Sequence, residues 1–198
     1  MLIRLSQPSG LVVSVEDVKA QAVIDTADDD TLLEAYIRAA TRFAEDRTGR
    51  ILLSAEFEWR ADGWCEPIAV PVVPIREVSE VVYLDDAQVE QTLAPADWYQ
   101  VETTEGVEIR FTDAFSSPSL SDRRNRPVRV RFTAGYDEPD VSGSGDDPEL
   151  KQDPMDRLIV MILVAHWYQS REPVAIGATV ASIPFSADAL IAMRRIFR

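Results

Sequence analysis

The chain has 198 residues, which suits one domain or a domain with a sizeable insertion, and its apolar fraction of 46% is enough for a packed core. Its 34 acidic and 20 basic residues give a net charge of −14. That charge argues against a protein that wraps DNA or binds an anionic membrane surface, because both depend on Lys and Arg. The single cysteine, Cys65, excludes an internal disulfide and suggests a reducing compartment.

The N-terminal part is predicted to be helical. Ser14 begins an S-x-x-D capping box, which predicts a short helix from about Val15 to Ile24. Apolar residues spaced by three and four then predict an amphipathic helix over residues 31–48. Asp30 is its expected N-cap and Gly49 its expected C-cap.

Three consecutive acids, Asp28–Asp30, precede this second helix and could hold a divalent cation. They lack the twelve-residue loop, the central glycine and the closing glutamate of an EF-hand. A role in capping the helix and complementing its dipole is favoured, and no metal site is predicted.

From residue 52 to residue 136 the apolar period changes to two, which predicts a β-rich insertion of five to seven short strands. A hairpin is expected where Val81–Leu84 runs into Asp85 and the chain returns through Val89. Residues 118–125 have the composition of an exposed loop. Further strand candidates are Phe57–Trp59, Trp98–Val101, Val107–Phe111 and Val128–Phe132.

Two more helices are predicted near the C-terminal end, which makes the fold class α+β. One begins at Pro154 and ends near Arg171, and the other is capped by Ser186 and spans Ala187–Phe197. Three to four helices would form a bundle with the β-rich subdomain inserted into it. The predicted parts are N-terminal bundle helices (1–51), the β-rich insertion (52–136), an acidic flexible linker (137–153) and a C-terminal helical and partner-binding segment (154–198).

The run Leu158–Ala165 is apolar nearly all round the helix. Its eight residues are far fewer than the ~20 that a membrane helix needs, so no membrane span is predicted. Such a helix must be covered on several sides. The sequence leaves two possibilities, a central core helix of one domain or a helix partly covered by a neighbouring chain.

No residue pattern indicates catalysis. His166, the only histidine, lies inside this apolar helix without a second histidine or a nearby cysteine, so a packed or interface histidine is favoured over a metal ligand or a base. The chain has no G-x-S-x-G elbow, no P-loop and no G-x-G-x-x-G. We therefore predict no catalytic residue, no cofactor and no enzymatic activity.

Five arginines form the one basic cluster, and their partners could be nucleic acid or acidic side chains. The rest of the chain repels phosphate, so pairing with acids of the same chain or of a neighbouring subunit is favoured. Two of the five share one face of a predicted strand by alternation. The cluster consists of Arg123, Arg124, Arg126, Arg129 and Arg131.

The order of these parts resembles the head–tail connector (adaptor) proteins of long-tailed bacteriophages, prophages and gene transfer agents. The resemblance spans nearly the whole chain. Its most specific pieces are the end of the long helix (RTGR, 47–50), the strand end FTAGY (132–136), and HWY (166–168) with RE (171–172). The ending SIPFSADALIAMRRIFR completes the order of parts.

The resemblance implies an architectural role in virus or gene-transfer-agent particles. Members form a twelve-fold ring between the portal protein and a tail-side stopper (head-completion) protein, and leave an axial channel through which DNA passes without specific binding. The ring would be assembled in the bacterial cytoplasm and reside at the head–tail junction. Acidic residues facing the channel would keep DNA from sticking, because like charges repel.

By analogy with members whose C-terminal segments grip the portal, residues 174–198 are expected to bind it. The alternative is packing against the domain's own helices. The expected portal-binding residues are Val180, Ile183, Phe185, Leu190 and Ile196, with Arg194, Arg195 and Arg198. Residues expected at a subunit interface or in the core are His166, Trp167, Tyr168 and Arg171.

Two hypotheses from other classes stay open. A stand-alone binding module whose β segment holds a ligand predicts a monomer with no affinity for capsid parts. A hydrolase that uses His166 with an unrecognised acid predicts lost turnover in a His166→Ala variant that stays folded.

Overall fold

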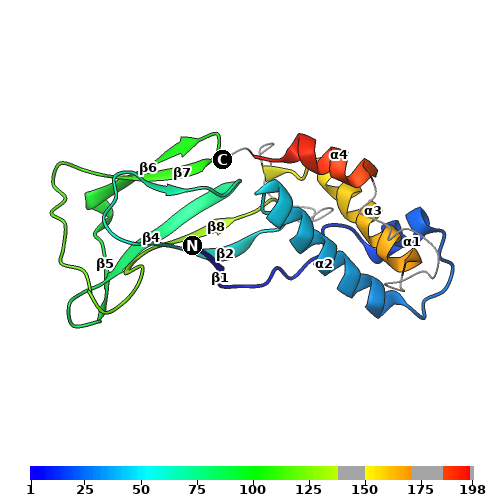
Figure 1. Cartoon of the computed structure of the whole chain (residues 1–198), viewed down its shortest axis with the longest axis horizontal. Helices are drawn as coiled ribbons and strands as arrows, with labels where there is room; N and C mark the ends of the chain where they lie inside the picture. The colour runs from blue at the N-terminus through cyan, green and yellow to red at the C-terminus, as the bar shows by residue number, and fades with distance from the viewer. Residues whose placement is uncertain (138–149, 171–184, 197–198) are drawn as a thin grey trace, which may run out of the picture. The chain divides into compact units, whose positions relative to one another are not determined.

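The computed structural model describes residues 1–137, 150–170 and 185–196. They form two compact units, a β unit of residues 1–8 and 54–135 and a helical unit of residues 9–53 together with the described residues after 135 (Figure 1). The helices and two antiparallel sheets confirm the predicted α+β class.

In the described part of the helical unit, α3 packs against the three other helices, as α2 also does. Its Ile159, Val160, Leu163 and Val164 are completely buried. The apolar run that the sequence left open is thus covered largely by its own unit. The helices are α1 (Val15–Ala22), α2 (Asp30–Thr48), α3 (Pro154–Gln169) and α4 (Phe185–Arg194).

The predicted helix starts are confirmed in one case and corrected in another. The Ser14 hydroxyl accepts a hydrogen bond at 3.0 Å from the backbone N–H three residues on, as in a capping box. The N-cap of α2 is Asp29 and not Asp30, and Asp29 makes no side-chain capping bond. Instead, the Asp30 carboxylate accepts from the Lys19 ammonium at 2.9 Å, which ties α2 to α1.

The described helices near the C-terminal end differ slightly from the prediction. The last helix begins at Phe185, so Ser186 lies within its first turn and is not its N-cap.

Residues 138–149 of the predicted linker lie outside the described residues. Hydrogen bonds hold both described ends of this predicted linker. The Asp137 N–H donates to the Leu150 carbonyl at 2.9 Å, and the Gln152 side-chain amide donates to the Leu52 carbonyl at 2.8 Å.

The β unit contains two antiparallel sheets, in the orders β1-β2-β8-β4-β5 and β3-β7-β6. Seven of these strands lie within residues 52–136, as predicted. A 3₁₀ turn, Pro95–Asp97, precedes β6. The strands are β1 (Leu2–Arg4), β2 (Ala55–Ala61), β3 (Ile68–Val70), β4 (Ile75–Leu84), β5 (Glu90–Thr92), β6 (Trp98–Thr103), β7 (Gly106–Phe111) and β8 (Val128–Ala134).

Strand β1 corrects the prediction that residues 1–51 form only the N-terminal helices. Leu2 pairs with Trp59 of β2 and Arg4 pairs with Phe57, so residues 1–8 belong to the β unit. A strand of three residues is too short to show the alternation of apolar and polar residues by which strands are predicted. The conformation of β1 is set by pairing with a strand more than fifty residues away.

Alternation along β8 separates a core face from a charged face. Val128, Val130 and Phe132 are buried, and Phe132 stacks on Phe57 of β2 at 5.8 Å between ring centroids. Arg129 and Arg131 occupy the alternate positions. An aromatic group links the two sheets and consists of Trp64, Tyr83 of β4, Phe111 of β7 and Phe115.

Candidate interaction sites

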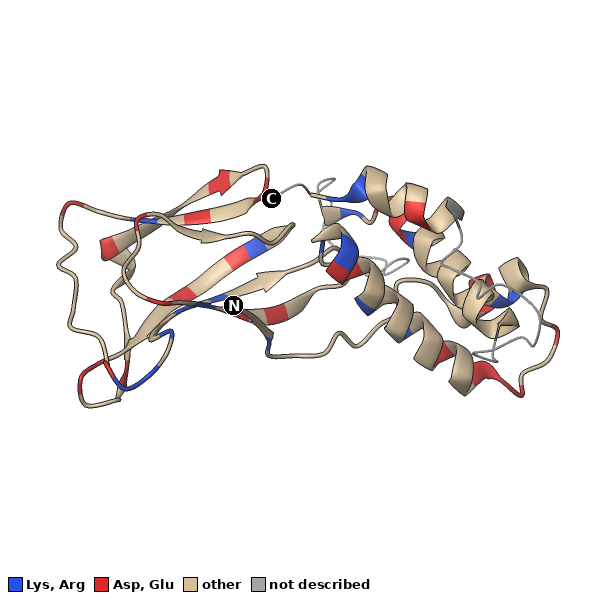
Figure 2. Cartoon of the chain, viewed as in Figure 1, with Lys and Arg blue, Asp and Glu red and all other residues tan. Residues whose placement is uncertain are grey.

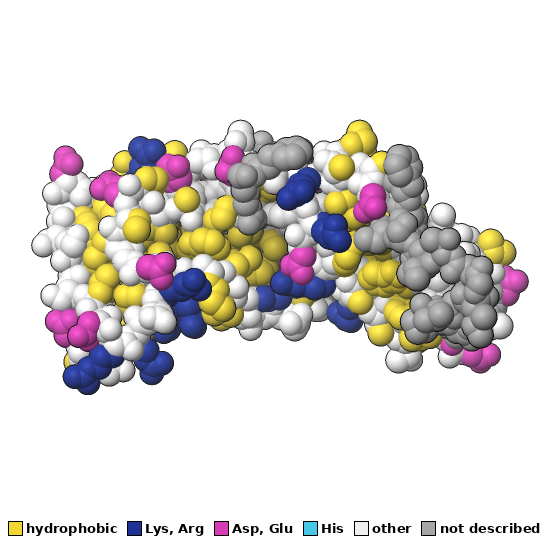
Figure 3. Space-filling view, in the orientation of Figure 1, with side chains coloured by type: hydrophobic (Ala, Val, Ile, Leu, Met, Phe, Trp, Pro, Cys, Tyr) yellow, Lys and Arg dark blue, Asp and Glu magenta, His cyan; other side chains and the backbone are white. Residues whose placement is uncertain are grey.

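The described residues contain no group of three or more His, Cys, Asp or Glu side chains placed to hold a metal ion. None of the described helices is long and apolar enough to cross a membrane. Charged clusters and an exposed helix face are the features on which a partner could act. Figure 2 shows the charged residues on both units, and Figure 3 shows basic, acidic and apolar side chains exposed on one face.

Arg194, at the end of α4, is bound inside the helical unit. Its Nε donates to Asp156 Oδ1 at 2.9 Å, one Nη donates to Asp156 Oδ2 at 2.6 Å, and the other Nη lies 2.8 Å from the Asp153 carboxylate. The Asp156 side chain is only 1% exposed. Hydrogen bonding to Asp156 raises the pKa of Arg194, against the lowering effect of burial. The guanidinium thus fixes α4 to the first turn of α3.

A second arginine extends this contact to the end of α2. Arg50 donates from Nε to the Arg194 carbonyl at 3.0 Å and from Nη1 to the Tyr136 hydroxyl at 2.8 Å. Beyond α4, the Ile196 N–H donates to the Thr48 carbonyl at 2.9 Å. We call Arg50, Tyr136, Asp153, Asp156 and Arg194 the C-terminal anchor.

The anchor revises the predicted partner-binding set. Arg194 cannot offer its guanidinium to a portal without breaking bonds to Asp156 and Asp153, so we remove it from that set. Leu190 packs against the helical core and Ile196 is half-buried, whereas Arg195 is exposed. Val180, Ile183 and Arg198 lie outside the described residues, as does the side chain of Phe185.

Two of the predicted interface-or-core residues on α3 contact α2 or its N-cap residue. The Trp167 ring makes edge contacts with the rings of Tyr36 and Phe43, at 6.4 and 6.1 Å between centroids. The Tyr168 hydroxyl donates to the Asp29 carboxylate at 2.7 Å. Trp167 and Tyr168 therefore pack within the unit, and His166 beside them is half-buried. Arg171 lies outside the described residues.

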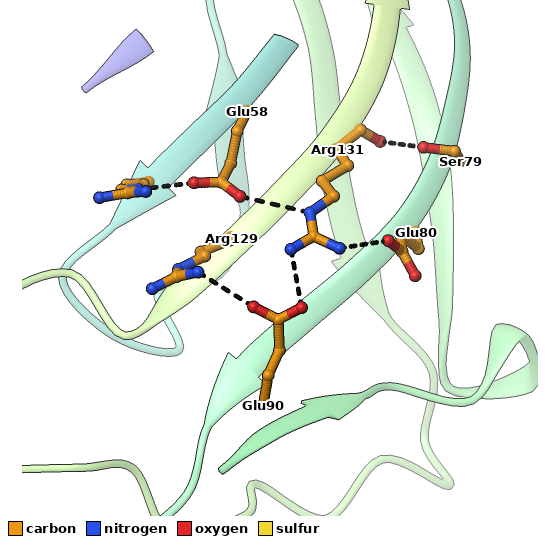
Figure 4. Close-up of polar contacts among 7 residues, drawn as sticks. Glu58, Ser79, Glu80, Glu90, Arg129 and Arg131 are labelled. Carbon is orange, nitrogen blue, oxygen red and sulfur yellow. Dashed lines mark hydrogen bonds and ion pairs between the residues drawn. The ribbon is translucent and has the colours of Figure 1, made fainter. Parts of the chain in front are cut away.

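Arg131 is the centre of a charge network on the polar face of the five-stranded sheet (Figure 4). Its guanidinium donates to Glu80 and Glu90 at 2.7 Å each and to Glu58 at 3.3 Å. Arg129 donates to the other oxygen of Glu90 at 3.0 Å. These two arginines of the predicted cluster thus pair with acids of their own chain, as favoured from the sequence.

Glu58 is the buried member of this network, with a side chain that is 3% exposed. It accepts from Arg60 at 2.6 Å and from Arg131 at 3.3 Å. Burial alone would raise the pKa of Glu58, but the hydrogen bonds from Arg60 and Arg131 outweigh it and lower the pKa below its ordinary value of 4.5. Glu58 is therefore a charged, paired carboxylate that joins β2 to β8.

The other three arginines of the cluster lie in the loop before β8. Arg126 is 3.4 Å from the exposed Asp62, and Arg123 is 4.0 Å from Asp122, which is also exposed. Arg124 is exposed and forms no ion pair with any described residue. The structure therefore splits the cluster into two arginines on the sheet that pair with glutamates and three on the loop that have weak ion pairs or none.

The anchor was missed from the sequence, although one signal was present. Asp156, Val160 and Leu163 follow the spacing i, i+4, i+7, which places an acid on the buried stripe of α3. A buried carboxylate requires a cationic or hydrogen-bonding partner. That spacing predicts a partner, but does not tell which distant arginine supplies it.

Part of the chain is similar to a family of head–tail connector proteins. Residues 12–92 match the model of the family described as phage gp6-like head-tail connector protein. This span begins within the helical unit, before α1, and ends with β5, so it includes parts of both units. No curated protein matches the chain.

Three similar solved structures extend the match over the whole chain. A chain in the neck of an empty gene transfer agent (GTA) particle, computed with C6 symmetry, is 28% identical with a TM-score of 0.74. A chain in the virion of a native GTA particle is 26% identical with a TM-score of 0.72. A chain in the neck of a native GTA particle computed with C12 symmetry is 25% identical with a TM-score of 0.70. Each match covers 100% of this chain and 96% of the other. The resemblance to phage and gene-transfer-agent head–tail connectors is thereby confirmed.

Proposed function

We propose that this protein is the structural adaptor of a head–tail junction, where it joins the portal to a tail-side stopper protein. The observation that carries the proposal is the full-length match to a GTA neck chain, at a TM-score of 0.74 and 28% identity. The match includes both units, so it supports the role of the whole chain and not of one shared subdomain.

A ring of twelve copies around an axial DNA channel is part of this proposal. The similarity to a neck chain in a structure computed with C12 symmetry supports that copy number. The net charge of −14 per copy suits a channel wall that does not retain DNA, because like charges repel phosphate. Assembly in the bacterial cytoplasm and residence in the neck of the particle complete the proposal.

The proposed role requires no catalysis. The similarity to structural neck proteins supports a non-enzymatic protein. We assign the half-buried His166 to packing within the helical unit, because its neighbour Trp167 is packed against the core there.

The proposed portal contact lies at α4 and the residues before it. The anchor holds α4 in place through Arg194, while Met193 is 73% exposed and Arg195 is exposed beside it. Exposed apolar side chains on a rigid helix are suited to a protein partner. Val180 and Ile183 stay in the proposed set as residues that lead into this helix.

Electron microscopy of particles from a strain that lacks this gene tests the adaptor role. We expect DNA-filled or leaking heads beside free tails, and restored particles when the gene is supplied in trans. Normal tailed particles from the deletion strain would show that the protein is not the adaptor. The His166→Ala variant is a useful companion, because it should restore particles if the histidine only packs.

A further inference from the structure

The ring proposed above needs a contact between unlike surfaces of identical copies. A closed ring with cyclic symmetry is built from a heterologous interface, in which one face of each subunit meets a different face of the next. The β unit carries two exposed patches of opposite charge that meet this requirement. The inference below rests on the proposed ring and identifies which surfaces would close it.

The first patch is the basic loop, residues 122–126, between β7 and β8. Arg124 is exposed without an ion pair among the described residues, and Arg123 has only a 4.0 Å contact with Asp122, where the two side chains are 76% and 93% exposed. An exposed ion pair of this kind contributes little to stability, so Arg123 can readily exchange Asp122 for another partner.

The basic loop has a defined position despite its exposure. The Ser121 N–H donates to the Leu84 carbonyl at 2.9 Å, and the Leu84 N–H donates to the Pro127 carbonyl at 3.0 Å. Both ends of the loop are thereby fixed to the end of β4. The arginines are presented from a fixed base, which lowers the entropy cost of using them in an interface.

The second patch is the acidic edge, formed by Glu102 and Glu105 at the turn between β6 and β7. Both side chains are exposed, and neither has an ion-pair partner in the described part of the chain. The Thr103 hydroxyl donates to the Gly106 carbonyl at 3.1 Å, which helps to order the turn. The adjacent Glu108 is already paired with Arg110 at 2.9 Å. Strand β6 is also an edge strand of its sheet.

The two patches cannot neutralise each other within one copy. Figure 1 shows β6 and β7 along one side of the β unit and the loop before β8 at the opposite side, near the β4–β5 hairpin. Figure 2 shows basic residues on that loop and acidic residues on β6 and β7. Because both patches belong to one compact unit, their separation is fixed.

We propose that neighbouring copies in the ring meet through their β units, with the basic loop of one copy against the acidic edge of the next. A chain with net charge −14 has few positive surfaces to offer another copy, and this loop is one of them. Guanidinium–carboxylate pairs are strong and directional. Charge-complementary pairing of this kind fixes orientation and register more than it adds raw affinity.

Charge reversal of each patch tests the contact. The loop-reversed variant carries Arg123→Glu and Arg124→Glu, and the edge-reversed variant carries Glu102→Arg and Glu105→Arg. Self-association is measured by sedimentation velocity over a concentration series of the full chain, at low and at high salt. Each reversed variant alone should lose about tenfold or more in its association constant, because like charges then face each other.

An equimolar mixture of the two reversed variants should associate again. The acidic loop of one variant then faces the basic edge of the other, and the next contact around the ring pairs the two unchanged patches. Alternating copies can close any ring with an even number of subunits, including twelve. A chain that had merely failed to fold could not be rescued by mixing, so rescue separates a lost contact from a lost fold.

Reversal at another exposed site supplies the matched control. Arg38→Glu with Arg42→Glu on the outer face of α2 makes the same change of charge and should leave association as in the unaltered chain. If the reversed variants associate normally, the proposed contact between the two patches is wrong, but the proposed ring is unaffected. Reversed variants that associate normally but lose binding to the portal or to DNA would assign the loop to that partner instead. An unaltered chain that stays monomeric at every concentration would overturn the ring itself, and this contact with it.

Discussion

Arg194 and Asp156 form a two-pronged ion pair at 2.9 and 2.6 Å that joins the end of α4 to the start of α3. The carboxylate is 1% exposed and the guanidinium 15%, so water screens the pair poorly. The same arginine accepts from Arg50 through its carbonyl. The position of the last described helix therefore depends on one buried charge and its partner.

Replacing this arginine should destabilise the helical unit strongly. Arg194→Met keeps the length of the side chain but leaves the Asp156 charge buried without its partner, which costs about 3–5 kcal/mol. Urea unfolding followed by circular dichroism at 222 nm measures the loss. Arg195→Met, one residue on and exposed, should change the free energy of unfolding by less than about 0.5 kcal/mol. Equal effects of the two substitutions would show that the ion pair does not hold α4.

The charge network on the sheet predicts a stability that depends on pH. The pKa of Glu58 is lower in the folded chain than its ordinary value of 4.5, so its contribution is fully present above that value and is lost as the pH falls through the folded-state pKa. Glu58→Gln should cost about 2 kcal/mol at pH 7, since charge-assisted hydrogen bonds to a buried group are lost. The difference from the unaltered chain should shrink below about pH 4.5.

Unfolding by urea at a series of pH values from 3 to 7 measures that difference. Glu56→Gln is the control, because Glu56 lies on the same strand with an exposed side chain, and it should stay within about 0.5 kcal/mol at every pH. A constant deficit of Glu58→Gln at every pH would mean that Glu58 contributes through shape and not through its charge.

The elements that the sequence predicted are those whose burial is periodic along the chain. The spacing of apolar residues in α2 and the alternation in β8 each follow from one face meeting a core. The alternation of side chains along β8 also predicted that Arg129 and Arg131 share one face of the strand. It could not tell that Glu58 and Glu80 lie opposite Arg131, because that depends on the strand order β2-β8-β4, which arises from long-range pairing.

Partners that are distant in sequence escaped prediction for the same reason. Asp156 and Arg194 are 38 residues apart, and nothing local to either indicates the other. Strand β1 exists only because β2 offers it an edge. The partner-binding residues are harder still, since an exposed side chain such as Met193 carries no periodic signal that separates a docking surface from ordinary exposure.

Gly106, at the start of β7, should not tolerate a side chain. Its φ is +146°, and a Cβ placed on it would lie 2.1 Å from the Val70 carbonyl oxygen. Gly106→Ala must therefore push β3 away from β7 and should cost about 2 kcal/mol or more, measured by thermal unfolding. A Cβ on Gly63 meets nothing within 4 Å, so Gly63→Ala should be close to neutral. A fully stable Gly106→Ala chain would contradict this packing of β3 on β7.

The outer face of α4 is the place to test portal binding, and a point substitution is better than a truncation. Deleting everything after Arg171 would remove Arg194 and leave Asp156 buried without a partner, so a loss of binding would not be distinguishable from a loss of fold. Met193→Asp changes only a side chain that is 73% exposed.

If α4 contacts the portal, Met193→Asp should weaken portal binding about tenfold or more, because a charge would be buried at the interface. The free energy of unfolding should stay within about 0.5 kcal/mol, because the side chain is exposed in the free chain. Binding is measured with purified portal by biolayer interferometry. Val23→Asp is the matched control, since Val23 is 83% exposed at the end of α1 and should bind as the unaltered chain does. Unchanged binding of Met193→Asp would remove this face of α4 from the portal contact, and an equal loss in both variants would point to added negative charge as the cause.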